Sequence, residues 1–266
     1  MIPFPNIDPD LIQIGPLRIR WYGLMYVLGF LASYFLIQKQ KRSRELGLTG
    51  QTAQDLIFYL AVGLIVGARL GYIAFYQYTD YMMYLKNPLE IFATWHGGMS
   101  FHGGLLGAVA AGYIFSRRRK IPFWPAADSV IVTAPIGLGL GRIGNFINGE
   151  LWGRTTDVPW AMIFPGAGPL PRHPSQLYQA LGEGFLLFLV LWFLRKRGYR
   201  DGTMVVLFLC LYGAIRFFLE FFREPDAHLG FFLGYFTMGQ LLCVAMILSG
   251  AVIAFCLRKN QSPGHP

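Results

Sequence analysis

Charged residues are scarce in this 266-residue chain: Asp, Glu, Lys and Arg together make up only 14% of it. A soluble domain normally carries about 25%. Hydrophobic residues make up 54%, and several apolar runs approach the roughly 20 residues that a helix needs to cross a bilayer. The composition therefore excludes an ordinary soluble protein and predicts an all-α polytopic membrane protein.

Cysteine is also rare. Cys210, Cys243 and Cys256 all lie inside apolar runs, without a C-x-x-C spacing. This pattern supports neither a disulfide framework nor a metal site, and we expect no metal and no cofactor. The N-terminal stretch MIPFPNIDPD contains no basic residue, so it does not resemble a signal peptide, and we expect the first apolar run to be a retained anchor.

The apolar runs predict seven transmembrane helices in a single integral membrane domain that covers residues 1–266. They lie near residues 22–38, 55–76, 97–116, 126–147, 176–194, 202–222 and 235–257. The longest polar connection, at about 148–175, is rich in Gly and Pro and is predicted to be a periplasmic loop. We find no internal repeat, so an inverted-repeat transporter gains no support.

The net charge of +9 comes from basic residues at the ends of spans. Fourteen of the 23 Lys and Arg residues follow spans one, three, five and seven. Basic residues at helix ends mark the cytoplasmic side of a membrane. This distribution predicts a periplasmic N-terminus and a cytoplasmic C-terminus, and it argues against a nucleic-acid partner.

Polar residues interrupt the predicted spans at a common depth. Three aspartates are expected to open spans two, four and six from the cytoplasmic side: Asp55, Asp128 and Asp201. An arginine follows each of them after 14 or 15 residues: Arg69, Arg142 and Arg216. At 1.5 Å per helical residue, these arginines lie about 20–23 Å from the cytoplasmic helix ends. His102 and Tyr26 reach the same depth, and Glu183 lies slightly lower. Ionisable groups inside a bilayer are costly, so the set predicts a shared cavity in the outer half of the membrane.

The stretch HGGMSFHGG (96–104) begins the third predicted span and contains His96 and His102. Histidine can accept a proton near neutral pH, so His102 is a candidate base. The alternative is a histidine that only forms a hydrogen bond between helices. Ser100 does not stand in a G-x-S-x-G motif, so an intramembrane serine hydrolase is only weakly indicated.

The stretch GRIGNFINGELWG (141–153) overlaps a G-x-G-x-x-G match at Gly139, Gly141 and Gly144. The dinucleotide-binding motif requires a strand, a turn and a helix in that order. Here the match lies inside a predicted membrane span, so nucleotide binding is not supported. Small residues at this spacing favour close packing of helices.

The remaining polar residues point to an anionic lipid. Arg142 and Arg216 offer planar guanidinium groups that suit phosphate oxygens. Asn145, Asn148 and Glu150 can form hydrogen bonds with the hydroxyls of a polyol headgroup. His173 and Gln176, in HPSQLY (173–178), are expected at the same outer opening. The residues predict a phospholipid site that opens to the outer leaflet. A structural ion pair between Arg216 and Glu220 and a transporter for lipids or anions are the alternatives.

Seven motifs, taken in order, resemble the prolipoprotein diacylglyceryl transferases of bacterial inner membranes. They are WYGLMY (21–26), GARLGY (67–72), HGGMSFHGG (96–104), GRIGNFINGELWG (141–153), HPSQLYQALGEG (173–184), YGAIRFFLEFFREPD (212–226) and TMGQLL (237–242). The resemblance implies transfer of the diacylglyceryl group of phosphatidylglycerol to the lipobox cysteine of a prolipoprotein, with release of glycerol phosphate. It also implies a multi-pass protein of the inner membrane with a periplasmic active site and no nucleic-acid partner.

The resemblance further implies the roles of particular residues. It marks His102, Arg142 and Arg216 as catalytic residues. The arginines would stabilise the leaving phosphate, and His102 would either accept the thiol proton or orient the headgroup. The residues predicted to bind phosphatidylglycerol are these two arginines together with Tyr26, Arg69, Asn145, Asn148, Glu150, Gly153, Tyr212 and Glu220. Membrane lipids and the signal peptides of prolipoproteins are the expected partners.

Overall fold

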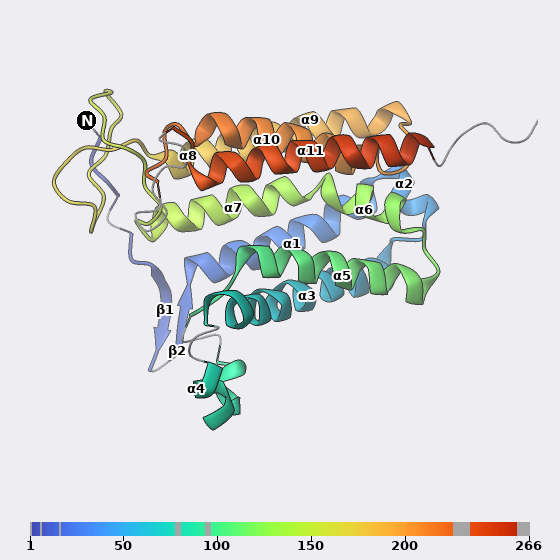
Figure 1. The fold of residues 1–266 in the computed structure, drawn as a ribbon, viewed down its shortest axis with the longest axis horizontal. Helices are drawn as coiled ribbons and strands as arrows, with labels where there is room; N and C mark the ends of the chain where they lie inside the picture. Colours follow the sequence, from blue (N-terminus) through green and yellow to red (C-terminus); the bar gives the residue numbers. More distant parts are fainter. Residues whose placement is uncertain are drawn as a thin grey trace, which may run out of the picture. The chain divides into compact units, whose positions relative to one another are not determined.

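The computed structural model describes residues 2–5, 7–15, 17–77, 81–93, 97–225 and 235–259. His96 of the stretch HGGMSFHGG and Asp226 of the stretch YGAIRFFLEFFREPD lie outside the described residues. The chain forms two compact units, one of residues 1–36 and 128–266 and the other of residues 37–127. Figure 1 shows the helices of both units.

The first unit begins with an antiparallel hairpin in which Ile12 pairs with Ile19 and Ile14 with Leu17. Its elements are β1 (Asp10–Ile14), β2 (Leu17–Arg20), α1 (Trp21–Lys39), α6 (Phe123–Ile131), α7 (Ala134–Ile147), α8 (Ser175–Gln179), η3 (Ala180–Leu186), α9 (Leu187–Leu194), η4 (Arg195–Arg197), α10 (Thr203–Leu219) and α11 (Met238–Lys259). The last residues of α1 and the first of α6 belong to the second unit. Helices α8, η3 and α9 follow one another without a break, and η3 is a π-helix.

Helices occupy all seven regions in which a span is predicted, and the prediction of an α-helical polytopic membrane protein is confirmed. Within the described residues, four helical segments are long and apolar enough to cross a membrane: Trp21–Lys39, Gly50–Tyr76, Ser175–Arg197 and Met238–Lys259. The bent pair α6 and α7 makes a fifth if it counts as one span. Helix α10 is apolar but has 17 residues.

The fourth predicted span is broken, which the sequence did not predict. Helices α6 and α7 meet at a bend of 40° between Ile131 and Ala134, and Pro135 stands in the first turn of α7. A proline in a helix interior removes a hydrogen bond, so a new helix starts there. Asp128 was expected to open this span, but it lies inside α6, and its carboxylate accepts hydrogen bonds from the backbone N–H groups of Gly202 and Val205. It therefore caps α10 instead.

Two apolar clusters stabilise the first unit. The larger one contains Leu187, Leu191, Phe208 and Tyr212, from α9 and α10, together with Val132. The smaller one joins Phe146 at the end of α7 to Met162 and Phe164 in the loop of residues 148–174. Inside a bilayer such clusters stabilise the fold mainly through van der Waals packing, because lipid tails are as apolar as the side chains themselves. The loop is thus packed onto the helices that carry the predicted site.

The second unit contains α2 (Lys41–Glu45), α3 (Gly50–Tyr76), α4 (Tyr81–Lys86), the 3₁₀-helix η1 (Pro88–Ile91) and α5 (Phe101–Arg119). Ser100 caps α5, because its hydroxyl accepts a hydrogen bond from the N–H of Gly103. Helices α3 and α5 are in backbone contact: a Cβ on Gly67 would lie 2.4 Å from the carbonyl oxygen of Gly103. Small residues at such a contact let two membrane helices approach closely.

Candidate active site

The turn that ends α7 joins three of the predicted headgroup residues. The Nδ2 atoms of Asn145 and Asn148 donate to one oxygen of Glu150, at 2.8 and 3.1 Å. The backbone of Glu150 is held as well, because its carbonyl accepts a 2.6 Å hydrogen bond from Gln176. Glu150 is exposed, whereas Asn145 is buried. The turn therefore presents one carboxylate that two amides hold, on a backbone that Gln176 fixes.

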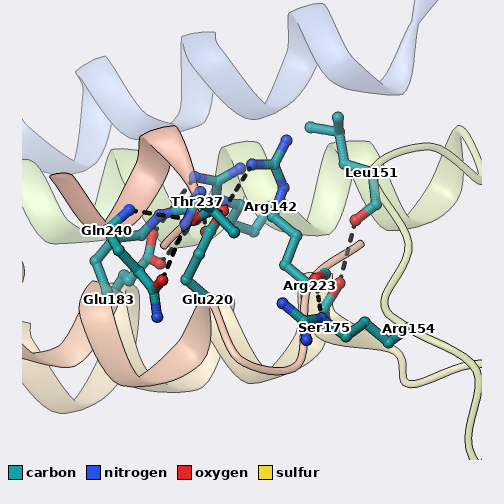
Figure 2. Close-up of polar contacts among 10 residues, drawn as sticks. Arg142, Leu151, Arg154, Ser175, Glu183, Glu220, Arg223, Thr237 and Gln240 are labelled. Carbon is teal, nitrogen blue, oxygen red and sulfur yellow. Dashed lines mark hydrogen bonds and ion pairs between the residues drawn. The ribbon is translucent and has the colours of Figure 1, made fainter. Parts of the chain in front are cut away.

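The two arginines of the predicted phosphate site share one carboxylate. The Oε1 of Glu183 lies 3.1 Å from the Nη1 of Arg216, and its Oε2 lies 3.5 Å from the Nη2 of Arg142. Glu183 is fully buried, while the Arg216 and Arg142 side chains retain 11% and 20% exposure. Figure 2 shows Glu183 and Arg142 in this cluster. The sequence predicted that the partner of Arg142 is a substrate phosphate and not a protein group. The exclusion of a protein partner is wrong, because Arg142 pairs with Glu183, and the contact with a phosphate stays a prediction.

A second carboxylate continues this cluster. Glu220 lies 3.0 Å from Arg216, one helical turn away, and 3.3 Å from Arg223. Its Oε1 also accepts a hydrogen bond from the hydroxyl of Thr237, whose backbone N–H donates to Gln240. Figure 2 shows Glu220 among these residues. The ion pair between Arg216 and Glu220 that the spacing predicts is confirmed, and it is one link in a longer chain of charges.

Three further predicted site residues belong to the first unit. Tyr26 is 40% exposed, and its hydroxyl lies 3.2 Å from that of Tyr22. Tyr212 is buried one turn before Arg216 and stacks on Phe208. Gly153 has no room for a side chain, because a Cβ there would lie 2.5 Å from the carbonyl oxygen of Phe222. This close approach gives Gly153 a structural role whether or not it also contacts the lipid.

The other two predicted site residues, Arg69 and His102, belong to the second unit. Arg69 is buried and donates through all three of its guanidinium nitrogens to the backbone. It contacts the carbonyls of Glu90 (2.5 Å), Ile91 (3.0 Å), Gly97 (2.6 Å) and Gly98 (3.1 Å). These contacts favour a role for Arg69 in holding this segment, and its predicted contact with the lipid remains a prediction.

His102 stands in the first turn of α5, two residues after the Ser100 cap. Its side chain is exposed, and its ring lies edge-on to that of Phe101, with ring centroids 5.8 Å apart. An exposed ring on a capped helix is accessible to a substrate. The role of His102 as a base or as a binding residue stays a prediction.

His173 lies just before α8, beyond the end of the membrane-spanning segment. Its Nδ1 lies 3.2 Å from the hydroxyl of Tyr178, and its ring packs edge-on against Phe222. Burial lowers the pKa of His173 from its usual 6.5, because a charged ring is poorly solvated there. His173 is therefore favoured in its neutral form.

Sequence reasoning gave too little weight to the segment HPSQLYQALGEG. The predicted depth of Glu183 does not reveal its role, although an acidic residue in the middle of an apolar span itself indicates a functional site. Gln179, one turn earlier, is 1% exposed, and neither its amide nitrogen nor its oxygen has a hydrogen-bond partner among the described residues. Arg223 was also missed, since it follows the predicted span and resembles a helix-end charge.

Comparison with known proteins decides the family. The sequence profile of the family described as prolipoprotein diacylglyceryl transferase matches residues 9–256. The chain belongs to this family. The match extends over both units and contains every predicted site residue.

Within the described residues there is no group of three or more His, Cys, Asp or Glu side chains that could hold a metal ion.

Individual relatives in the family match over nearly their whole length. The phosphatidylglycerol–prolipoprotein diacylglyceryl transferase of Geobacter sulfurreducens is 53% identical over 258 residues, which cover 97% of this chain and 98% of that protein. The proteins of the same name from Desulfotalea psychrophila and Pseudoalteromonas atlantica are 52% and 51% identical. They cover 94% and 97% of this chain, and 93% and 92% of their own lengths.

Proposed function

We propose that this chain transfers the diacylglyceryl group of phosphatidylglycerol to the cysteine thiol of a prolipoprotein. The observation that carries the proposal is the pairing of Arg142 and Arg216 through Glu183 in a chain that matches the transferase family from residue 9 to residue 256. Two guanidinium groups held by one carboxylate suit a phosphate group that both can contact. The expected product is a thioether-linked prolipoprotein, and glycerol phosphate leaves.

In the reaction, the thiolate sulfur attacks the CH₂ carbon that is bonded to the phosphate oxygen. A C–S bond forms, the C–O bond breaks, and its electron pair stays on the phosphate. Negative charge therefore grows on the leaving group, and Arg142 and Arg216 stabilise it in the transition state. The thiol proton must leave before or during attack, since only the thiolate is strongly nucleophilic. His102 is the residue that we expect to accept this proton or to orient the headgroup.

The glycerol headgroup requires hydrogen-bonding partners for its hydroxyls. Asn145, Asn148 and Glu150 supply donors and acceptors from one turn. The buried Oδ1 of Asn148 has no hydrogen-bond partner among the described residues, and the same holds for the amide of Gln179. Buried polar atoms normally have partners, so a polyol would satisfy groups that the protein leaves open. Tyr26, Tyr212, Gly153 and Glu220 complete the proposed substrate site of this unit.

The proposed topology has seven spans, with a periplasmic N-terminus, a cytoplasmic C-terminus and an active site towards the periplasm. Its support is the position of the basic residues, which stand in the last turns of α1, α5 and α11 and throughout η4. Such clusters favour the cytoplasmic side. Helices α5 and α10 would be the remaining two spans. The bacterial inner membrane is the proposed location, because secreted prolipoproteins would reach the enzyme there.

One assay tests the activity directly. Purified protein is mixed with phosphatidylglycerol and a synthetic signal peptide that contains a lipobox cysteine, and the peptide mass is then measured. We expect the mass of one diacylglyceryl group to be added to this peptide, and no addition when serine replaces the cysteine. Absence of the adduct, in detergent or liposomes in which a related transferase is active, would refute the proposed function.

A further inference from the structure

Glu183 stands at a local irregularity of its helix. The π-helix η3, from Ala180 to Leu186, interrupts the α-helical run between α8 and α9. A π-turn includes an extra residue, so it changes the direction in which side chains point, and such turns are frequent at functional sites. Here it occurs around a carboxylate that is completely buried within the first unit.

A backbone contact brings this π-helix onto α7. A Cβ on Gly184 would lie 2.6 Å from the Cα of Gly139, and a Cβ on Gly139 would lie 3.0 Å from the Cα of Gly184. Any larger residue at Gly184 would push the two helices apart. Glu183 is the neighbour of Gly184, and Arg142 is one turn after Gly139. The glycine contact therefore accounts for how a short glutamate side chain reaches an arginine on another helix.

The Glu183 carboxylate connects two helices through two different atoms. One oxygen contacts Arg216 on α10 and the other contacts Arg142 on α7. The contact with Arg142 is longer by 0.4 Å, and Arg142 is the more exposed of the two arginines. Arg142 is thus the group that can exchange its carboxylate for a phosphate oxygen, while Arg216 stays held by Glu183 and Glu220.

The charges of the cluster nearly balance. Three guanidinium groups, those of Arg142, Arg216 and Arg223, face the carboxylates of Glu183 and Glu220, which leaves a formal charge of +1. The phosphodiester of an intact phosphatidylglycerol carries a charge of −1. The phosphate monoester that leaves is mostly a dianion at neutral pH, since its second pKa is about 6.

We propose that Glu183 is a positioning residue for this reaction. It holds Arg142 and Arg216 at a spacing that one phosphate can bridge, and its charge matches the cluster to a phosphodiester monoanion. Without this charge the cluster would retain the dianionic product more tightly. The inference rests on the proposed function, because it assigns Glu183 a task in that same reaction.

Two substitutions separate position from charge. Glu183→Gln keeps the length of the side chain and removes its charge, while Glu183→Asp keeps the charge and shortens the reach. For both variants we expect kcat to fall by about 10- to 100-fold, as misplaced groups typically cause, with less than about a threefold change in KM for phosphatidylglycerol. For Glu183→Gln alone, the inhibition constant of glycerol phosphate should fall about tenfold, since an opposing charge is lost nearby.

Glu224→Gln is the matched control. It removes a carboxylate from an ion pair with Arg172 that is 46% exposed on the Glu224 side, and we expect wild-type kinetics. Size-exclusion profiles and thermal unfolding identify folded variants, and Glu183→Asp carries the test if Glu183→Gln does not fold. A folded Glu183→Gln enzyme with wild-type kcat and product inhibition would overturn the inference. Equal losses of kcat in both variants, with unchanged product inhibition, would overturn the role of the charge. Failure of the wild-type enzyme to modify the peptide would instead refute the proposed function.

Discussion

The Nδ2 of Asn145 donates to the Oε1 of Glu150 at 2.8 Å, and this hydrogen bond closes the last turn of α7. The backbone repeats the connection, because the N–H of Glu150 donates to the carbonyl of Asn145. Asn145 follows Arg142 by three residues on the same helix. One turn of the protein therefore carries both Arg142, which is proposed to bind the phosphate, and Asn145, which is proposed to bind the glycerol hydroxyls.

Replacement of Asn145 by Leu should test this link. The change removes a buried amide that fixes Glu150, so we expect kcat/KM for phosphatidylglycerol to fall about 10- to 100-fold, the usual effect of misplacing a binding group. Kinetics with the lipobox peptide at saturation measure it. Asn148→Leu is the comparison, because its hydrogen bond to Glu150 is longer, at 3.1 Å, and its effect should be smaller. A larger loss in Asn148→Leu would contradict the proposed order of importance.

The two arginines should differ in what their loss does to the protein. Arg142→Ala and Arg216→Ala should each lower turnover by about 100-fold or more, as expected when a group that stabilises developing charge is removed. Arg216 pairs with two buried carboxylates, so its removal takes the shorter of two arginine contacts from each of them and should also destabilise the fold. Thermal unfolding and peptide mass measurements separate the effects. Full activity of folded Arg142→Ala would contradict its phosphate role.

Much of the site could be predicted because its residues interrupt apolar spans. Arg142, Arg216 and Glu220 stand out in hydrocarbon for the energetic reason that makes buried charges rare, and the i,i+4 spacing of the last two predicts their contact. Helical periodicity could not supply the tertiary partner of Arg142. The glycine contact that brings Glu183 to it depends on how α7 and η3 pack, which no local spacing encodes.

The positions of the helices could be predicted, because length and hydropathy determine them. The bend and the capping partner could not be predicted, because they depend on local geometry. All seven regions are helical, yet the predicted depth of Arg142 assumes a straight helix, and this segment bends between Ile131 and Ala134. Asp128 has the residue type of a helix cap, but it caps α10 rather than its own helix. Capping preferences identify the residue type without identifying which helix is capped.

Arg69 gives a prediction about the segment before α5. Its guanidinium satisfies four backbone carbonyls, and an unpaired buried polar group costs about 1–3 kcal/mol. Arg69→Ala should therefore lower the free energy of unfolding, because several carbonyls lose their donor. Arg69→Lys should restore little of that free energy, because an ammonium group cannot form the forked contacts of a guanidinium group. Thermal unfolding measures stability, and hydrogen exchange measures protection of residues 97–104. A stable Arg69→Ala protein that loses only lipid affinity would instead assign Arg69 to direct binding.

His173 predicts a dependence of stability on pH. Burial lowers its pKa from 6.5 in the folded chain, so below about pH 6.5 the unfolded chain binds the proton more readily than the folded one. The contribution of His173 to stability is thus complete above pH 6.5 and is lost as the pH falls below it. The melting temperature should drop more between pH 7.5 and 5.5 in wild type than in His173→Asn. Equal drops would contradict this.

His102 has two predicted roles that pH can separate. A free cysteine thiol has a pKa near 8.5, so it is only partly ionised at neutral pH and ionises without help at higher pH. If His102 accepts the thiol proton, the His102→Gln enzyme should be strongly impaired at pH 7. By pH 9 its activity should approach that of the wild-type enzyme at the same pH. Initial rates with the lipobox peptide, measured from pH 6.5 to 9.5, provide the profile.

The pH profile needs a control for the lipid site, because alkaline pH could also change phosphatidylglycerol binding. Asn145→Leu should lose activity by a constant factor across the same range, since an amide does not titrate there. A His102→Gln profile that is lowered equally at every pH would contradict the base and assign His102 to binding. Recovery at high pH in His102→Gln but not in Asn145→Leu would place the thiol proton on His102.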